Sequence, residues 1–183
     1  MTGQARFFLR SPRTDDLLRI QSWMQRPSVH AWFDFGQGRQ QISTTALNVM
    51  ARSAHYCMRV FGEQGRDTAL GVAVLSDVLH PFGTAHFWVV RDRQQSAYAG
   101  ITAEATRALL HLGFHTLARR SINAWVVESN TRSLRLLTSV GFQRFGTQRA
   151  CHCIDGQVLS RIHLELLPEH FHQTPPATQT PVA

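Results

Sequence analysis

The sequence contains no lysine, so all 19 of its basic residues are arginines. They exceed the 12 acidic residues and give a formal net charge of +7. Arginine suits phosphates and carboxylates because its planar guanidinium donates two parallel hydrogen bonds. The arginines are scattered along the chain, without a basic run or interleaved aromatic residues. This pattern argues against a nucleic-acid groove and favours a phosphate-rich ligand or an acidic partner.

Cysteines and long hydrophobic runs are also scarce. Three cysteines, an odd number, do not indicate a disulfide framework. Cys151 and Cys153 flank His152, but no second pair of Cys or His stands at zinc-ligand spacing, so we predict no metal site. No apolar run approaches the roughly 20 residues that span a bilayer, and the N-terminus lacks the hydrophobic core of a signal sequence. We therefore expect a cytoplasmic protein that does not enter the membrane.

The length and composition suit one folded domain. A chain of 183 residues, 43% of them hydrophobic, can bury a sizeable core. The last residues are rich in Pro, Thr and Gln and lack apolar periodicity. We predict a single domain over residues 1–172 and a disordered tail over residues 173–183.

Apolar periodicity predicts a chain of alternating strands and helices. Strands are expected at residues 7–10, 55–61, 69–75, 84–90 and 121–127, and helices at residues 15–25, 44–53, 101–118 and after Asn130. Asp155 and Gly156 form a hairpin turn signal that divides residues 144–167 into two further strands. The strands on either side of the long helix should be parallel neighbours joined by a right-handed crossover.

The most informative segment is residues 121–142. An apolar run typical of a buried strand ends abruptly at Ser129 and Asn130. Asn130 can cap a helix with its side-chain oxygen, and the apolar residues that follow recur at helical spacing. Gly141 fits the left-handed position at a helix C-terminus. Asn130 and Ser133 should therefore face the carboxyl end of a strand, where ligands bind in open α/β sheets.

This segment resembles the GNAT superfamily of N-acyltransferases, in particular its branch of ribosomal-protein N-terminal acetyltransferases. The residues that carry the resemblance are Asn130, Ser133, Leu137, Gly141 and Phe142. The order of elements matches over residues 6–167. The resemblance implies a layered α/β fold, with a mixed, mostly antiparallel sheet, helices on both faces and a parallel strand pair splayed at the cofactor site. It also implies transfer of an acetyl or other acyl group from acyl-CoA to a primary amine by direct attack.

The resemblance implies a cofactor site with one departure. In this superfamily, N–H groups of the turn before the long helix, together with the helix N-terminus, hold the pyrophosphate of coenzyme A. Here the turn keeps Gly100, whereas Ala97 replaces a leading Arg or Gln and Thr102 replaces a small residue. Arg91 and Arg93 could add charge nearby. The residues expected to bind the cofactor are Val89, Val90, Gln95, Ala97, Tyr98, Ala99, Gly100, Ile101, Thr102, Asn130 and Ser133.

The catalytic roles implied by the resemblance fall on a few of these residues. A backbone N–H of Val89 or Val90 would bind the thioester carbonyl. Ser133 would protonate the departing thiolate. The attacking amine must first lose a proton, because an alkylammonium cannot attack. His86 and Glu128 are the candidate bases, and a chain of water molecules is a third candidate.

Residues 28–43 concentrate aromatic side chains before a flexible pair of glycines. These aromatic residues either fill the edge of the core or form a wall of the acceptor site. In the second case Trp32 and Asp34 would bind the acceptor, and Asp34 could also deprotonate the amine.

Two other hypotheses stay open at the level of sequence. The donor could be an acyl carrier protein, which is acidic and would be attracted by a charge of +7. The chain could instead be a non-catalytic binding module of the same fold, a hypothesis that the altered turn at residues 97–102 supports. The acceptor, a small molecule or a peptide N-terminus, and a homodimeric state are also left open.

Overall fold

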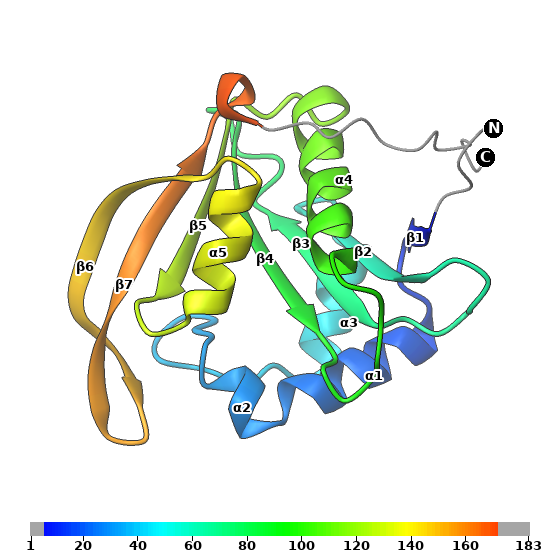
Figure 1. The fold of residues 1–183 in the computed structure, drawn as a ribbon, viewed down its shortest axis with the longest axis horizontal. Coiled ribbons are helices and arrows are strands. Elements are labelled where there is room, and N and C mark those ends of the chain that lie inside the picture. The colour runs from blue at the N-terminus through cyan, green and yellow to red at the C-terminus, as the bar shows by residue number, and fades with distance from the viewer. Residues whose placement is uncertain (1–5, 172–183) are drawn as a thin grey trace.

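A computed structural model describes residues 6–171, so the predicted tail at residues 173–183 lies outside the described part of the chain. Seven strands form one sheet in the order β1-β2-β3-β4-β5-β7-β6 (Figure 1). The strands are β1 (Phe7–Arg10), β2 (Tyr56–Glu63), β3 (Gly71–Ser76), β4 (Thr84–Arg91), β5 (Ser121–Val127), β6 (Gln143–Ile154) and β7 (Gln157–Leu166). The helices are α1 (Thr14–Met24), α2 (Pro27–His30), α3 (Thr44–Arg52), α4 (Ile101–His115) and α5 (Thr131–Ser139), followed by a 3-10 turn at Pro168–His170.

The predicted fold class is confirmed. β4 and β5 form a parallel pair, and the other neighbouring strands are antiparallel. Each predicted strand and helix is present, and α2 is an additional short helix within the aromatic segment. β7 inserts between β5 and β6, so the last strand within residues 6–171 pairs with β5. Among residues 6–171, no helix is both long and apolar enough to cross a membrane.

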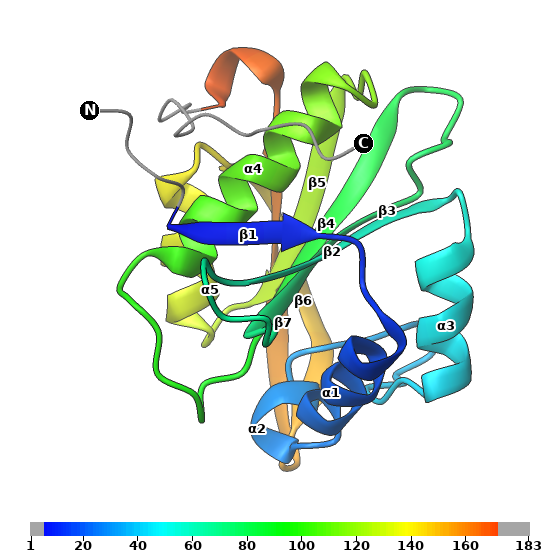
Figure 2. The same cartoon turned by 90° about the vertical axis from the view of Figure 1, so that its right-hand side faces the viewer.

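Helices cover both faces of the sheet (Figure 2). α4 and α5 lie on one face, and α1, α2 and α3 lie on the other. The central strand β3 serves both cores, because successive side chains point to opposite faces. Ala73 and Leu75 join the cluster beneath α4, whereas Val72 and Val74 join the cluster beneath α1 and α3. This double burial explains why β3 is a continuous apolar run in the sequence.

The parallel strands β4 and β5 separate along their length. They are paired from Thr84 to His86 on β4 and from Ser121 to Asn123 on β5. Beyond that point β4 remains paired with β3 as far as Arg91, and β5 remains paired with β7. The two strands diverge toward their carboxyl ends, with α5 lying over the opening (Figure 1). The predicted splayed pair is therefore present.

The segment that follows β5 has the predicted local structure. Asn130 caps α5, since its Oδ1 accepts a hydrogen bond from the N–H of Ser133 at 3.2 Å. Gly141 has a φ of 108°, and a Cβ there would lie 2.0 Å from the carbonyl oxygen of His170. Glycine at this position lets the chain turn from α5 into β6 against the 3-10 turn at Pro168–His170.

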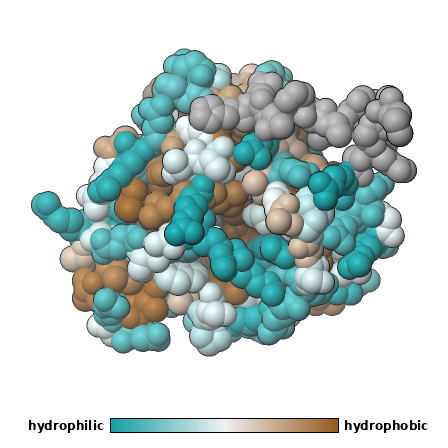
Figure 3. Space-filling view, viewed as in Figure 1, coloured by the Kyte–Doolittle hydropathy of each residue, from teal (hydrophilic) through white to brown (hydrophobic). Residues whose placement is uncertain are grey.

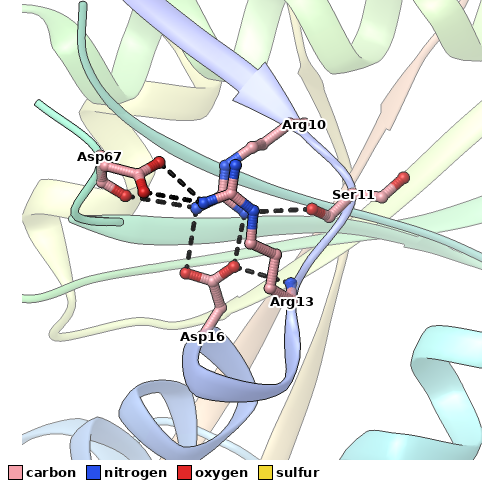
Figure 4. Close-up of polar contacts among 5 residues, drawn as sticks. All are labelled: Arg10, Ser11, Arg13, Asp16 and Asp67. Carbon is pink, nitrogen blue, oxygen red and sulfur yellow. Dashed lines mark hydrogen bonds and ion pairs between the residues drawn. The ribbon is translucent and has the colours of Figure 1, made fainter. Parts of the chain in front are cut away.

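A cluster of charged residues joins β1 to α1 (Figure 4). Asp16 accepts hydrogen bonds from the backbone N–H of Arg13 at 2.7 Å and from the guanidinium of Arg10 at 2.5 Å. The Asp16 side chain is 6% exposed. Arg13 also binds Asp67 at 2.8 Å, but the Asp67 side chain is 80% exposed. The buried carboxylate, rather than the exposed one, fixes where α1 begins.

These two carboxylates make a matched pair for a stability test. Asp16→Ala should lower the free energy of unfolding by about 2–4 kcal/mol, because it removes the acceptor for the N–H of Arg13 at the start of α1 and the carboxylate partner of the partly buried Arg10. Asp67→Ala should change it by less than about 1 kcal/mol. Urea unfolding measures both values, and equal losses would contradict this assignment.

Candidate active site

A cleft of 1610 Å³ opens where β4 and β5 separate. Its walls include Trp88, Val89 and Val90 on β4, residues 124–127 of β5, and the start of α5. The opposite wall comes from α1, the aromatic segment after α2, and α3. On the face that carries α4 and α5, apolar surface is exposed beside hydrophilic side chains (Figure 3). The lining of the cleft itself combines apolar side chains, such as Trp88 and Leu137, with polar ones, such as Asn130 and Arg132.

The backbone of β4 presents unpaired donors to this cleft. The N–H of Asp92 donates to the carbonyl oxygen of Leu70 at 2.8 Å, in register with the β3–β4 pairing. Hydrogen-bonding direction alternates along an antiparallel strand, so the N–H of Val90 also points toward β3. The N–H groups of Val89 and Arg91 therefore point toward the gap beside β5. Of the two predicted carbonyl-binding residues, Val89 has the suitable orientation.

Asn130 and Ser133 lie together in the lining of the cleft. Asn130 uses its Oδ1 to cap α5, which leaves its Nδ2 donor for a ligand. Ser133 lies in the first turn of α5 and is half-buried. The end of β5 thus places an amide and a hydroxyl opposite the open edge of β4.

Three arginines line the same end of the cleft: Arg91, Arg93 and Arg132. Arg91 donates from Nη2 to the carbonyl oxygen of Gln95 at 3.3 Å, but its buried Nε has no partner among the described residues. Loss of hydration, followed by the charges of Arg132 and Arg91, lowers the pKa of Arg93. The three cations repel one another, so an anion bound among them would be stabilised. Arg132 was missed in the sequence, although its place between Asn130 and Ser133 was the available signal.

The turn before α4 differs from an unoccupied anion-binding turn, because donor groups of Tyr98 already have partners within the protein. The N–H of Tyr98 donates to Oε1 of Glu63 at 3.0 Å, and the Tyr98 hydroxyl donates to Glu104 at 2.8 Å. Burial and the hydrogen bond to Glu104 raise the pKa of Tyr98. Gly100 stands at the N-terminus of α4 with a φ of 100°, and Ile101 is fully buried. The residues of the expected cofactor site that lie outside the lining of the cleft are Gln95, Ala97, Tyr98, Ala99, Gly100, Ile101 and Thr102.

The acceptor-side residues Trp32 and Asp34 both line the cleft. Oδ1 of Asp34 accepts hydrogen bonds from the N–H groups of Gly36 and Gly38, and Oδ2 accepts one from Arg161 at 2.8 Å. The hydrogen bond from Arg161 holds the pKa of Asp34 below its ordinary value of 3.8. Asp34 is thus an ionised anchor that ties the aromatic segment to β7.

The two candidate bases lie in different surroundings. His86 is exposed on β4 and lines the cleft, on the same face of the strand as Trp88. Glu128 lies outside the lining, and its Oε1 accepts a hydrogen bond from the N–H of Ser160 at 2.7 Å. His86 is therefore the candidate that the fold brings to the cleft. Within residues 6–171, no group of three or more His, Cys, Asp or Glu side chains could hold a metal ion.

The sequence matches the family profile described as an acetyltransferase (GNAT) domain over residues 6–143. The fold is similar to spermidine N-acetyltransferase from Vibrio cholerae in complex with CoA and spermine (TM-score 0.77, 16% identity, 90% of this chain and 97% of that chain). It is also similar to RimJ from Mycobacterium smegmatis in complex with CoA-disulfide (TM-score 0.74, 19% identity, 96% and 90%). A third similar structure is the ribosomal-protein-S5-alanine acetyltransferase from Vibrio fischeri (TM-score 0.72, 16% identity, 93% and 98%). No curated protein sequence matches the chain significantly.

The chain therefore belongs to the GNAT acetyltransferase family. As a member of this family it is an acyl-CoA-dependent N-acyltransferase, as the resemblance of residues 121–142 implied. The match to the family profile does not favour either of the two alternatives, a carrier-protein donor and a non-catalytic binding module. At 16–19% identity, the similarity to the solved structures establishes the fold and leaves the acceptor open.

The contribution of the Asp34–Arg161 ion pair to the free energy of unfolding should depend on pH. Asp34 has a lowered pKa, so its stabilising effect is complete above the ordinary value of 3.8 and is lost as the pH falls through the lower folded-state value. At neutral pH, Asp34→Asn should lower the free energy of unfolding by about 1–3 kcal/mol. The difference from the unmodified protein should shrink as the pH falls below 3.8 and through the lower folded-state value. Urea unfolding across this range tests it, and a difference that does not change with pH would contradict it.

Proposed function

We propose that the chain transfers an acetyl group from acetyl-CoA to a primary amine inside the cleft between β4 and β5. The observation that carries this proposal is the meeting of three features at one opening. They are the free N–H of Val89, the start of α5, and the cluster of Arg91, Arg93 and Arg132. The CoA complexes among the structural relatives support acyl-CoA as the donor. We place the reaction in the cytoplasm.

The residues present fit the phosphates of coenzyme A. The unpartnered Nε of Arg91 and the mutually repelling arginines beside it match an anion with several oxygens. Because Glu63 already engages the N–H of Tyr98, we assign most of the phosphate binding to arginine side chains. The N-terminus of α4 at Gly100, with the rest of the turn from Ala97 to Thr102, adds its helix dipole.

The catalytic roles follow from orientation. The N–H of Val89 donates to the thioester oxygen as negative charge develops there, an effect worth about 10²–10³ in rate in comparable sites. Asn130 binds the amide groups of the pantetheine arm through Nδ2. Ser133 supplies a proton to the sulfur that leaves.

The proton of the acceptor ammonium goes to His86. His86 is three residues from Val89, or about 10 Å along the strand, so the proton passes through water. Asp34 acts on the acceptor indirectly, because it holds the wall that carries Trp32. Glu128 contributes to the site only by closing the end of β5 onto β7.

Substitution of the arginines tests the donor site. Arg93→Gln and Arg132→Gln should each weaken acetyl-CoA binding about tenfold, because each removes a charge-assisted contact to phosphate. Calorimetry with acetyl-pantetheine, which lacks the nucleotide phosphates, should show no change for either variant. Arg19→Gln, on the exposed side of α1, is the matched control and should bind acetyl-CoA normally. Unchanged acetyl-CoA binding by both cleft variants would contradict the phosphate assignment.

Two further variants test the chemical step through thiol release from acetyl-CoA in the presence of a primary amine. Ser133→Ala should lower kcat about 10- to 100-fold with little change in acetyl-CoA affinity. His86→Gln should lower kcat/KM about 100-fold or more, because it removes the group that accepts the proton of the amine. If His86→Gln keeps its activity, the base lies elsewhere. An intact protein that does not bind acetyl-CoA would exclude the proposed function.

A further inference from the structure

We propose that the acceptor is a monoamine that carries an aromatic or similarly bulky apolar group, seated on Phe33, Phe35 and Trp88. This inference rests on the proposed function and concerns the other end of the same cleft. The proposed acceptor is therefore not a polyamine, although a spermidine N-acetyltransferase is among the structural relatives of this chain.

The three rings form one packed platform. Phe33 and Phe35 are stacked, with ring centroids 5.6 Å apart and planes within 4°. Both meet Trp88 edge-on, at centroid distances of 5.8 and 6.1 Å and angles of 80°. All three rings line the cleft and are half-buried, so part of each ring is open to a ligand. Such a surface gains free energy when it covers apolar area.

The platform is also held in place before any ligand arrives. Asp34, which stands between the two phenylalanines, is bound by Arg161 on β7. The guanidinium of Arg161 lies 4.2 Å from the ring centroid of Trp125 and 3.0 Å from Nδ1 of His152. The N–H of Phe35 donates to the carbonyl oxygen of Arg39 at 2.7 Å and closes the loop. A wall that is already ordered loses little conformational entropy when the acceptor binds.

The charges of the cleft oppose a polyamine. Among the described lining residues the acidic side chains are Asp34 and Asp77, and the basic ones are Arg26, Arg39, Arg91, Arg93 and Arg132. The charge of Asp34 is neutralised by Arg161, and Arg26 is paired with Asp92 at 2.7 Å. Asp77 can balance one ammonium group. A second or third ammonium would find no further carboxylate among the described lining residues, and its loss of hydration would be uncompensated.

A panel of amines tests this assignment through thiol release from acetyl-CoA. Phenethylamine and 2-cyclohexylethylamine carry a bulky apolar group with and without a π-system, ethanolamine carries none, and spermidine carries additional ammonium groups. A short peptide amide with N-terminal Phe extends the panel from small molecules to peptide N-termini. The kcat/KM values of the bulky monoamines should exceed those of ethanolamine and spermidine by roughly tenfold or more. A value for spermidine equal to or above that of phenethylamine would overturn the proposal.

Substitutions in the aromatic platform provide a second test of the acceptor assignment. Trp88→Ala and Phe35→Ala should lower kcat/KM for phenethylamine about tenfold or more and change that for ethanolamine by less than about threefold. Phe35→Leu, which keeps most of the apolar volume, should recover much of the loss. Phe82→Ala removes an aromatic side chain that is 72% exposed and outside the cleft, and it should change neither value.

Acetyl-CoA affinity, measured by calorimetry on each variant, keeps the two proposals separate. A platform variant that binds acetyl-CoA normally but loses all amines equally would overturn the acceptor assignment and leave the proposed function standing. A protein that binds no acetyl-CoA would remove the proposed function, and with it this inference.

Discussion

The site depends on the point at which β4 and β5 stop pairing. Hydrogen bonds hold the two strands together as far as His86 and Asn123, and beyond them each strand is held by its other neighbour. Both strands therefore stay paired on their outer sides along the gap. The N–H of Val89, however, has no hydrogen-bond partner on a neighbouring strand. An unpaired backbone donor in a partly apolar cleft is unfavourable unless a ligand accepts from it. The same divergence gives access from both faces of the sheet, so a donor and an acceptor can meet at one point.

The two sides of the cleft have different chemistry. Arg91, Arg93 and Arg132 gather at the side of α5, where their mutual repulsion favours a polyanion. Aromatic rings gather at the side of α1 and α3, where Phe33 and Phe35 pack against Trp88. In the proposed function a phosphate-bearing thioester enters from the first side and an amine from the second. The distribution of charge would then orient both substrates before the chemical step.

Short sequence patterns predicted the parts of the fold that are determined by interactions between neighbouring residues in the chain. The Asn130 cap and the left-handed Gly141 are determined by a few neighbouring residues, and both were found where expected. The wall of the acceptor side was not predictable in the same way, because Asp34 and Arg161 are 127 positions apart in the chain. Likewise, only the packed structure brings Glu63 to the N–H of Tyr98. Side-chain contacts between distant residues decide what the cleft binds, whereas local patterns decide that a cleft exists.

Amide hydrogen exchange with and without acetyl-CoA tests whether the gap between β4 and β5 holds the donor. Acetyl-CoA should slow exchange at the N–H groups of Val89 and Arg91 and in the first turn of α5. These are the donors that face the gap between β4 and β5. Protection confined to other parts of the chain, with no change at Val89 and Arg91, would contradict this placement of the donor.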